Sequence, residues 1–208
     1  MKQIDLESWN RKEHFDFFSS LKSPFFGITA EVDCTNAYAW CRAEGHSFFA
    51  TYLHRSMVAV NDVPAFRLRL FDGAVYETDT IHAGTTIGRE DGTFAFSMIT
   101  YSPRFSEFLE SMQQEIAEVK NSTGLRRHVE NGRKDFIRHS TVPWLSFTAI
   151  LHPTNLDQQE SIPKITFGKF REQDGRKWMP VSVEAHHGLM DGLHIGQYFK
   201  RFQELLNQ

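Results

Sequence analysis

The densest group of reactive side chains in the sequence begins with two adjacent histidines, His186 and His187. Asp191 and His194 follow shortly after them. A neutral imidazole is the ordinary side chain best matched to removing a proton near neutral pH. The local pattern places the pair where a strand ends and a helix begins, a position typical of functional sites. The group therefore indicates a general base, and a histidine pair held only by structural hydrogen bonds is the alternative.

A metal site formed by His186, His187, Asp191 and His194 is another alternative. Adjacent residues of a strand point to opposite faces, so His186 and His187 do not easily share one ion. We therefore expect no metal ion, and we interpret Asp191 and Gly192 as residues that shape the turn after the histidines.

The elements that must position this group alternate between helix and strand patterns. Apolar residues spaced by three and four predict helices over residues 47–61, from Ser102 to about Gly124, and from about Leu193 onward. A further short helical stretch is expected around Cys34 and Cys41. Strands are expected over residues 66–76 with a hairpin at Asp72-Gly73, and over residues 93–100, 145–151, 165–170 and 178–185. The basic residues 125–139 are expected to form an exposed loop, with contact to a ligand as an open alternative and no chemistry assigned to them. Together these patterns predict an α/β two-layer sandwich.

The composition suits one globular unit. The chain has 208 residues, of which 40% are apolar and 13% aromatic, and it shows no repeat or linker, so a single domain is expected over residues 1–208. A net charge of -3 offers no strong field for nucleic acid or an anionic membrane. Two cysteines, no signal-like N-terminus and no membrane-length apolar run predict a soluble cytoplasmic protein.

The string formed by residues 186–192, HHGLMDG, resembles the HHxxxDG signature of the chloramphenicol acetyltransferase family. Residues 9–15 (WNRKEHF), 140–147 (STVPWLSF) and 166–170 (TFGKF) resemble three further blocks of that family, and they occur in the family's order. Shortened forms of the signature also occur in dihydrolipoamide acyltransferase cores, and it occurs in peptide-synthetase condensation domains, which fuse two such units. The resemblance spans almost the whole chain and implies the coenzyme A-dependent acyltransferase fold, a mixed β-sheet covered by helices.

The resemblance implies a direct transfer in which His187 is the general base and an acceptor hydroxyl attacks the thioester carbonyl of acetyl-CoA, without an acyl-enzyme. It implies that Ser140 donates a hydrogen bond to the tetrahedral oxyanion and that Thr166 holds a water near the same intermediate. A serine close before Pro143 is also a common turn residue, and a threonine is ordinary in a strand.

The resemblance also implies supporting roles. Asp191 pairs with Arg11 as a structural ion pair, and Lys169 lies near coenzyme A, although an exposed N-terminal arginine and a solvated lysine are the simpler interpretations. Phe18 and Phe25 are expected in the acceptor pocket. The resemblance implies a homotrimer whose sites lie between subunits.

Two positions depart from the family's pattern. Met190 stands where a cysteine is usual, and Phe18 stands where a tyrosine is frequent, which removes a hydroxyl from the acceptor pocket. We therefore expect acetyl transfer to a hydroxyl of chloramphenicol, with two alternatives: the same chemistry on another hydroxyl or thiol acceptor, and a catalytically silent ligand-binding homologue.

Overall fold

The computed structural model describes residues 1–155 and 160–208. The strands in these ranges are β1 (Lys2–Gln3), β2 (Phe25–Asp33), β3 (Leu68–Phe71), β4 (Ala74–Glu77), β5 (His82–Gly88), β6 (Phe94–Ile99), β7 (Phe136–Val142), β8 (Lys164–Gly168), β9 (Arg171–Gln173) and β10 (Arg176–His186). The α-helices are α1 (Lys12–Ser19), α2 (Thr35–Ala43), α3 (Phe48–Asp62), α4 (Phe105–Lys120) and α5 (Gly192–Leu206), with 3₁₀ turns at Pro64–Arg67 and Arg127–Val129. None of these helices is long and apolar enough to cross a bilayer.

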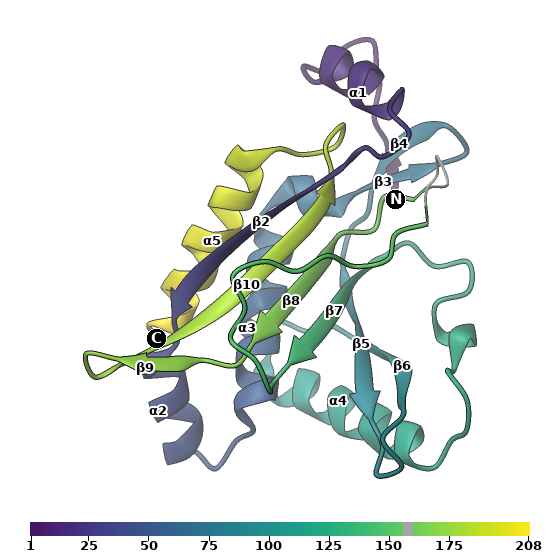
Figure 1. The fold of residues 1–208 in the computed structure, drawn as a ribbon. Helices are drawn as coiled ribbons and strands as arrows, with labels where there is room; N and C mark the ends of the chain where they lie inside the picture. Colours follow the sequence, from purple (N-terminus) through teal and green to yellow (C-terminus); the bar gives the residue numbers. More distant parts are fainter. Residues whose placement is uncertain (156–159) are drawn as a thin grey trace.

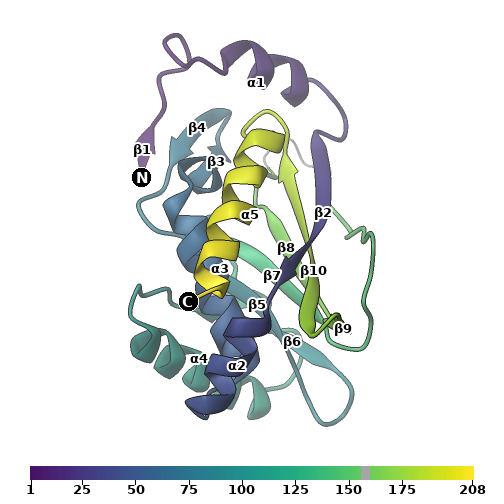
Figure 2. The same cartoon turned by 90° about the vertical axis from the view of Figure 1, so that its left-hand side faces the viewer.

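The large sheet has the order β2-β10-β8-β7-β5-β6, with β9 paired to one end of β10 (Figure 1). Strand β7 pairs in parallel with β5 on one side and with β8 on the other. The pairs β2-β10, β10-β8 and β5-β6 are antiparallel. Helices α2, α3, α4 and α5 lie on one side of this sheet, and the segment that follows β7 crosses its other side (Figure 2). The predicted two-layer arrangement with a mixed sheet is therefore confirmed.

The core lies between the large sheet and its helices because alternate strand residues point toward them. Ile137, Ile165 and Val183 on three neighbouring strands are fully buried against Leu53 of α3 and Phe202 of α5. The residues between them, on the opposite face, are polar or charged. One face of the sheet therefore stabilises the fold, and the other is available for binding.

Several elements form as the sequence predicts. Ser47 caps α3, since its hydroxyl accepts a hydrogen bond from Ala50 N at 3.4 Å. Asp72 and Gly73 both adopt positive φ, at 48° and 77°, which closes the β3-β4 hairpin. Strand β10 covers the predicted residues 178–185, and α5 begins at Gly192.

Two expectations are wrong. Residues 145–151 form no strand, although they are rich in apolar and aromatic types, because they have no strand partner and Leu145 and Leu151 are exposed. Residues 136–139 are not loop but the first half of β7, where pairing with β5 and β8 outweighs their basic, weakly periodic sequence.

Arg69 fixes the start of β7 relative to the small sheet β1-β4-β3. Its guanidinium is fully buried and donates hydrogen bonds to four carbonyl oxygens, at distances of 2.6 to 2.8 Å: those of Lys134, Phe66, Leu68 and Phe136. Burial lowers the pKa of Arg69 to about 9, so the group still carries its charge at neutral pH. The strand that carries Ser140 therefore depends on this cation for its position.

Replacing Arg69 with Met should lower the free energy of unfolding by about 2–5 kcal/mol, because several buried carbonyls lose their donor at once. Urea unfolding followed by circular dichroism measures the change. The matched control is Arg171→Met, which removes an exposed ion pair with Glu31 and should change the free energy of unfolding far less, because solvent screens this pair. Equal losses in the two variants would contradict the structural role of Arg69.

Candidate active site

His187 follows the last residue of β10, and two aromatic rings hold its imidazole. Phe18 stacks on it with ring centroids 3.8 Å apart and an interplanar angle of 2°, and Phe26 packs at 4.3 Å and 34°. The backbone N–H of His187 donates to Pro24 O at 2.7 Å. Its Nδ1 is buried without a hydrogen-bond partner among the described residues, and the half-buried ring leaves Nε2 as the nitrogen that can meet a reactant. Stacking rather than a carboxylate therefore orients this ring.

His186 points to the opposite face of the strand and has a structural part. Its ring is buried, Nδ1 accepts a hydrogen bond from the Gly188 N–H at 3.1 Å, and Phe25 packs edge-on at 5.7 Å. Burial lowers the pKa of His186 to about 4, so the ring stays neutral. Of the two histidines, His187 alone has the exposure a general base needs.

Arg11 and Asp191 meet across 180 positions of sequence and fix the turn beyond His187. Arg11 Nη1 donates to Asp191 Oδ2 at 2.5 Å, and Nη2 lies 3.4 Å from the carbonyl oxygen of His187. Asp191 also caps α5, since its Oδ1 accepts from Leu193 N at 3.0 Å. Burial alone would raise the pKa of Asp191, but the hydrogen bond and charge of Arg11 outweigh it and lower the pKa to about 2.

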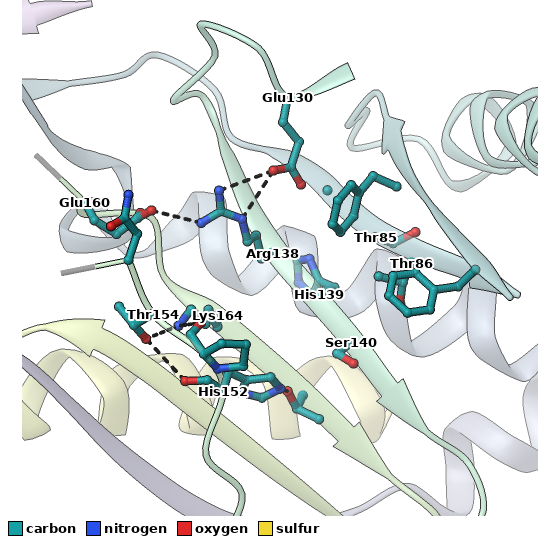
Figure 3. Close-up of a pocket in the computed structure, with 16 residues that line it drawn as sticks. Thr85, Thr86, Glu130, Arg138, His139, Ser140, His152, Thr154, Glu160 and Lys164 are labelled. Carbon is teal, nitrogen blue, oxygen red and sulfur yellow. Dashed lines mark hydrogen bonds and ion pairs between the residues drawn. The ribbon is translucent and has the colours of Figure 1, made fainter. Parts of the chain in front are cut away.

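A cavity of about 420 Å³ opens on the face of the sheet away from the helices, a size that suits a small molecule. Ser140 on β7 and its lateral partner Thr166 on β8 both line it. Figure 3 shows Ser140 along β7 from Arg138, with His152 and Lys164 on the neighbouring side. The other lining residues are Gly84, Thr85, Thr86, Phe94, Phe96, Glu130, His139, Pro153, Thr154, Asn155 and Glu160.

Two hydrogen bonds and one ion pair connect four of the side chains at this cavity or beside it. Thr166 Oγ1 lies 3.0 Å from His152 Nε2, and His152 Nδ1 lies 2.5 Å from Glu184 Oε1. The other oxygen of Glu184 is 3.8 Å from Lys164 Nζ, which also donates to Pro153 O. Burial lowers the pKa of Lys164, and Glu184 opposes that shift.

The predicted site residues form two groups, not one. His187, Phe18, Arg11 and Asp191 lie together at the end of β10, whereas Ser140 and Thr166 lie in the cavity. Thr166 pairs with Ser182, five residues before His187 on β10, so the strand rise alone separates Thr166 from His187 by about 17 Å. Within one chain, His187 and Ser140 therefore do not act on the same atom.

The remaining predicted residues lie near one or the other group. Phe25 contacts His186 and lies 5.7 Å from the ammonium of Lys164, but it does not line the cavity. Lys169 is exposed just after β8, and its backbone N–H donates to Leu145 O. No group of three His, Cys, Asp or Glu side chains in the described ranges could hold a metal ion.

Sequence reasoning missed His152, Lys164 and Glu160, which line the cavity, and Glu184 beside it. Each is a single polar residue in an otherwise ordinary strand or loop, so no spacing pattern marks it. Arg138 and Glu130 fall in the basic segment 125–139, to which no chemistry was assigned. A charged residue inside an apolar strand is the available signal, since Glu184 interrupts the run Val181, Val183, Ala185.

Comparison with known proteins covers the full length of the chain. A family model described as chloramphenicol acetyltransferase matches residues 1–203. A chloramphenicol acetyltransferase of Proteus mirabilis is 28% identical, over 99% of this chain and 94% of the relative. Chloramphenicol acetyltransferase 2 of Haemophilus influenzae is 31% identical, over 97% of this chain and 94% of the relative.

The fold agrees with these matches. A solved chloramphenicol acetyltransferase is similar with a TM-score of 0.92 and 33% identity, covering 99% of this chain and all of that one. A dihydrolipoamide acetyltransferase of Azotobacter vinelandii shares the fold with a TM-score of 0.70 at 18% identity, over 94% of this chain and 86% of that one.

Two substitutions separate the charge of Asp191 from its capping role. Asp191→Asn keeps a good N-cap and loses the ion pair, and it should lower the free energy of unfolding at pH 7 by about 1–2 kcal/mol. Asp191→Ala loses both and should cost about 1 kcal/mol more.

The pH dependence of the same variants checks the ion pair. Because the folded pKa of Asp191 lies below its unfolded value, the stability from this carboxylate is complete above about pH 4 and is lost as the pH falls toward 2. Chemical unfolding of wild type and Asp191→Asn across this range should therefore converge at acid pH. A constant difference would contradict the pairing.

Proposed function

The chain belongs to the chloramphenicol acetyltransferase family, and on this premise we propose that it transfers an acetyl group from acetyl-CoA to a hydroxyl of chloramphenicol. One observation carries the proposal: the ring of His187 is held between Phe18 and Phe26 with Nε2 open to a reactant. A base in a fixed orientation with one free nitrogen is what deprotonation of an alcohol requires.

The proposed reaction is a direct acyl transfer. His187 Nε2 removes the proton of the acceptor hydroxyl while that oxygen bonds to the thioester carbonyl carbon. The hydroxyl of Ser140, which lines the cavity, donates to the resulting oxyanion. When the carbon–sulfur bond breaks, protonated His187 returns the proton to the coenzyme A thiolate, so the acetyl ester and free coenzyme A leave and the base is neutral again.

The reacting groups come together only if two copies of the chain combine. His187 of one copy must reach the cavity with Ser140 and Thr166 of another, because the strand rise keeps these groups about 17 Å apart within a chain. Exposed apolar side chains near the cavity support such contacts, since Trp144 is 78% and Leu151 89% exposed. We infer a homotrimer with three equivalent sites between subunits, in agreement with the family resemblance.

Lys169 offers a cation for the phosphates of the coenzyme. It is exposed beyond the end of β8, three residues from Thr166, so it can contact a long substrate that enters toward the cavity. Both cysteines are free and buried, which suits the reducing cytoplasm where we place the reaction.

Replacing His187 with Ala should lower acetyl transfer by about 100- to 10,000-fold while the protein stays folded, because the alcohol loses its base. Purified protein is mixed with acetyl-CoA and chloramphenicol, and thiol release is followed with a chromogenic reagent. The matched control is His46→Ala, which removes a histidine that packs on Trp40 and Phe105 and does not line the cavity, and this variant should keep the activity.

Thermal unfolding of both variants shows that the comparison is between folded proteins. Thiol release that is equal in wild type and His187→Ala would remove the role of this base. Release that depends on His187 with other hydroxylated acceptors but not with chloramphenicol would keep the chemistry and change the acceptor.

A further inference from the structure

The face of the sheet that lines the cavity carries two rows of polar side chains. Arg138, Lys164 and Glu184 are lateral neighbours on β7, β8 and β10, and two positions along the strands Ser140, Thr166 and Ser182 form a parallel row. None of these six side chains belongs to the helix-covered core, which lies on the opposite face. The first row supplies charges and the second supplies hydroxyls.

Arg138 stands between two carboxylates at one end of the cavity, as Figure 3 shows. Its Nη1 is 3.2 Å from Glu160 Oε2, and its Nε and Nη2 are 3.4 and 3.2 Å from Glu130 Oε2. A guanidinium has five N–H donors and each carboxylate has about four acceptor sites, so all three groups keep hydrogen-bonding capacity for a ligand.

At the other end of the charged row, Glu184 and His152 determine the direction in which the hydroxyl of Thr166 donates its proton. Because the Glu184 carboxylate accepts from His152 Nδ1, a neutral His152 presents an unprotonated Nε2, and the hydroxyl of Thr166 donates its proton to it. The lone pairs of Thr166 then remain for a hydrogen-bond donor in the cavity. A ligand hydroxyl is such a donor.

Aromatic rings complete the lining. Phe94 and Phe96 lie on β6, at the edge of the sheet beyond β7 and β5. A ligand with a carbon skeleton and several hydroxyls can pack its C–H groups on the aromatic rings and hydrogen-bond through its hydroxyls to the charged side chains. An ion-pair cluster at a cavity rarely stabilises a fold more than apolar packing would, so this combination points to recognition of a ligand.

We propose that the acceptor cavity also takes polyhydroxylated acceptors of the sugar and sugar-alcohol class, whose additional hydroxyls bind Arg138, Glu130, Glu160 and Thr166 while one hydroxyl is acetylated. This inference rests on the proposed acetyl transfer and adds a second class of acceptor to it. Polar groups in a cavity select for ligands that hydrogen-bond to them, because a ligand without such groups displaces the water that would occupy their remaining donor and acceptor positions.

The test compares acceptors and a variant that removes the charges together. Methyl glucopyranoside, N-acetylglucosamine, sorbitol and chloramphenicol are each supplied with acetyl-CoA, and thiol release and the acetylated product are measured. The triple variant Arg138→Met, Glu130→Gln and Glu160→Gln removes one cation and both its carboxylates, so no charge is left unpaired. It should lower kcat/KM for the best polyhydroxylated acceptor by about 10- to 100-fold, and for chloramphenicol by less than about threefold.

The matched control neutralises a similar cluster on the helix side of the molecule. Arg201 also stands between two carboxylates, Asp62 and Glu204, and its side chain is 37% exposed against 35% for Arg138. Arg201→Met with Asp62→Asn and Glu204→Gln should leave both acceptor classes unchanged. Thermal unfolding of both triple variants confirms that they are folded.

Binding of the four acceptors to wild type without acetyl-CoA, measured by calorimetry, keeps this inference separate from the catalytic proposal. Tighter binding of a polyhydroxylated acceptor to wild type than to the Arg138 triple variant supports the inference even if no transfer occurs. The inference is overturned if none of the three polyhydroxylated compounds binds or reacts, or if the triple variant affects them and chloramphenicol equally. Absence of His187-dependent thiol release with every acceptor would instead contradict the proposed acetyl transfer.

Discussion

The fixed rise per residue of an extended strand sets the distance between the two groups of site residues. Strand β10 carries Ser182, level with the acceptor cavity, and ends beside His187, five residues farther on. At about 3.3 Å per residue, no side-chain rotation closes the gap between His187 and the cavity. Under the proposed mechanism, in which His187 is the base and Ser140 the oxyanion donor, the two groups must therefore come from different copies of the chain, and the exposed Trp144 and Leu151 would be contact residues between them.

Three interactions from distant parts of the sequence fix the orientation of the His187 ring, which we propose as the base. The Phe18 ring comes from the segment before β2, the Phe26 ring from β2 itself, and Arg11 reaches the turn through Asp191. The buried Nδ1 of His187 has no acceptor among the described residues, so stacking and the backbone bond to Pro24 hold the imidazole in place of the carboxylate found in a Ser-His-Asp arrangement. Both oxygens of the Asp191 carboxylate are bonded, one to Arg11 and the other to the first turn of α5, so the role of Asp191 is structural.

The layer architecture can be predicted from the sequence, which also points to His187 as the base that we propose. Prediction fails where strand pairing depends on residues far away in the sequence. Periodicity placed α3 and α5, and Asp72-Gly73 placed the β3-β4 turn, because these signals are local. Residues 145–151 have strand-like composition without a partner strand, and residues 136–139 have loop-like charges inside β7. The contact between Arg11 and Asp191 spans 180 positions, so only the family resemblance predicted it. His152 and Glu184 carry no local signal and depend on the fold to meet Thr166.

The most direct test of a site shared between subunits uses two inactive variants in one assembly. His187→Ala and Ser140→Ala subunits are each assayed alone, then unfolded, mixed in equal amounts and refolded together. A site between subunits regains one intact His187 and one intact Ser140 in about one quarter of the interfaces, so the mixture should recover roughly a quarter of wild-type acetyl transfer. If the mixture shows no more activity than the two variants measured separately, the base and the cavity do not come from different chains, and the account is wrong.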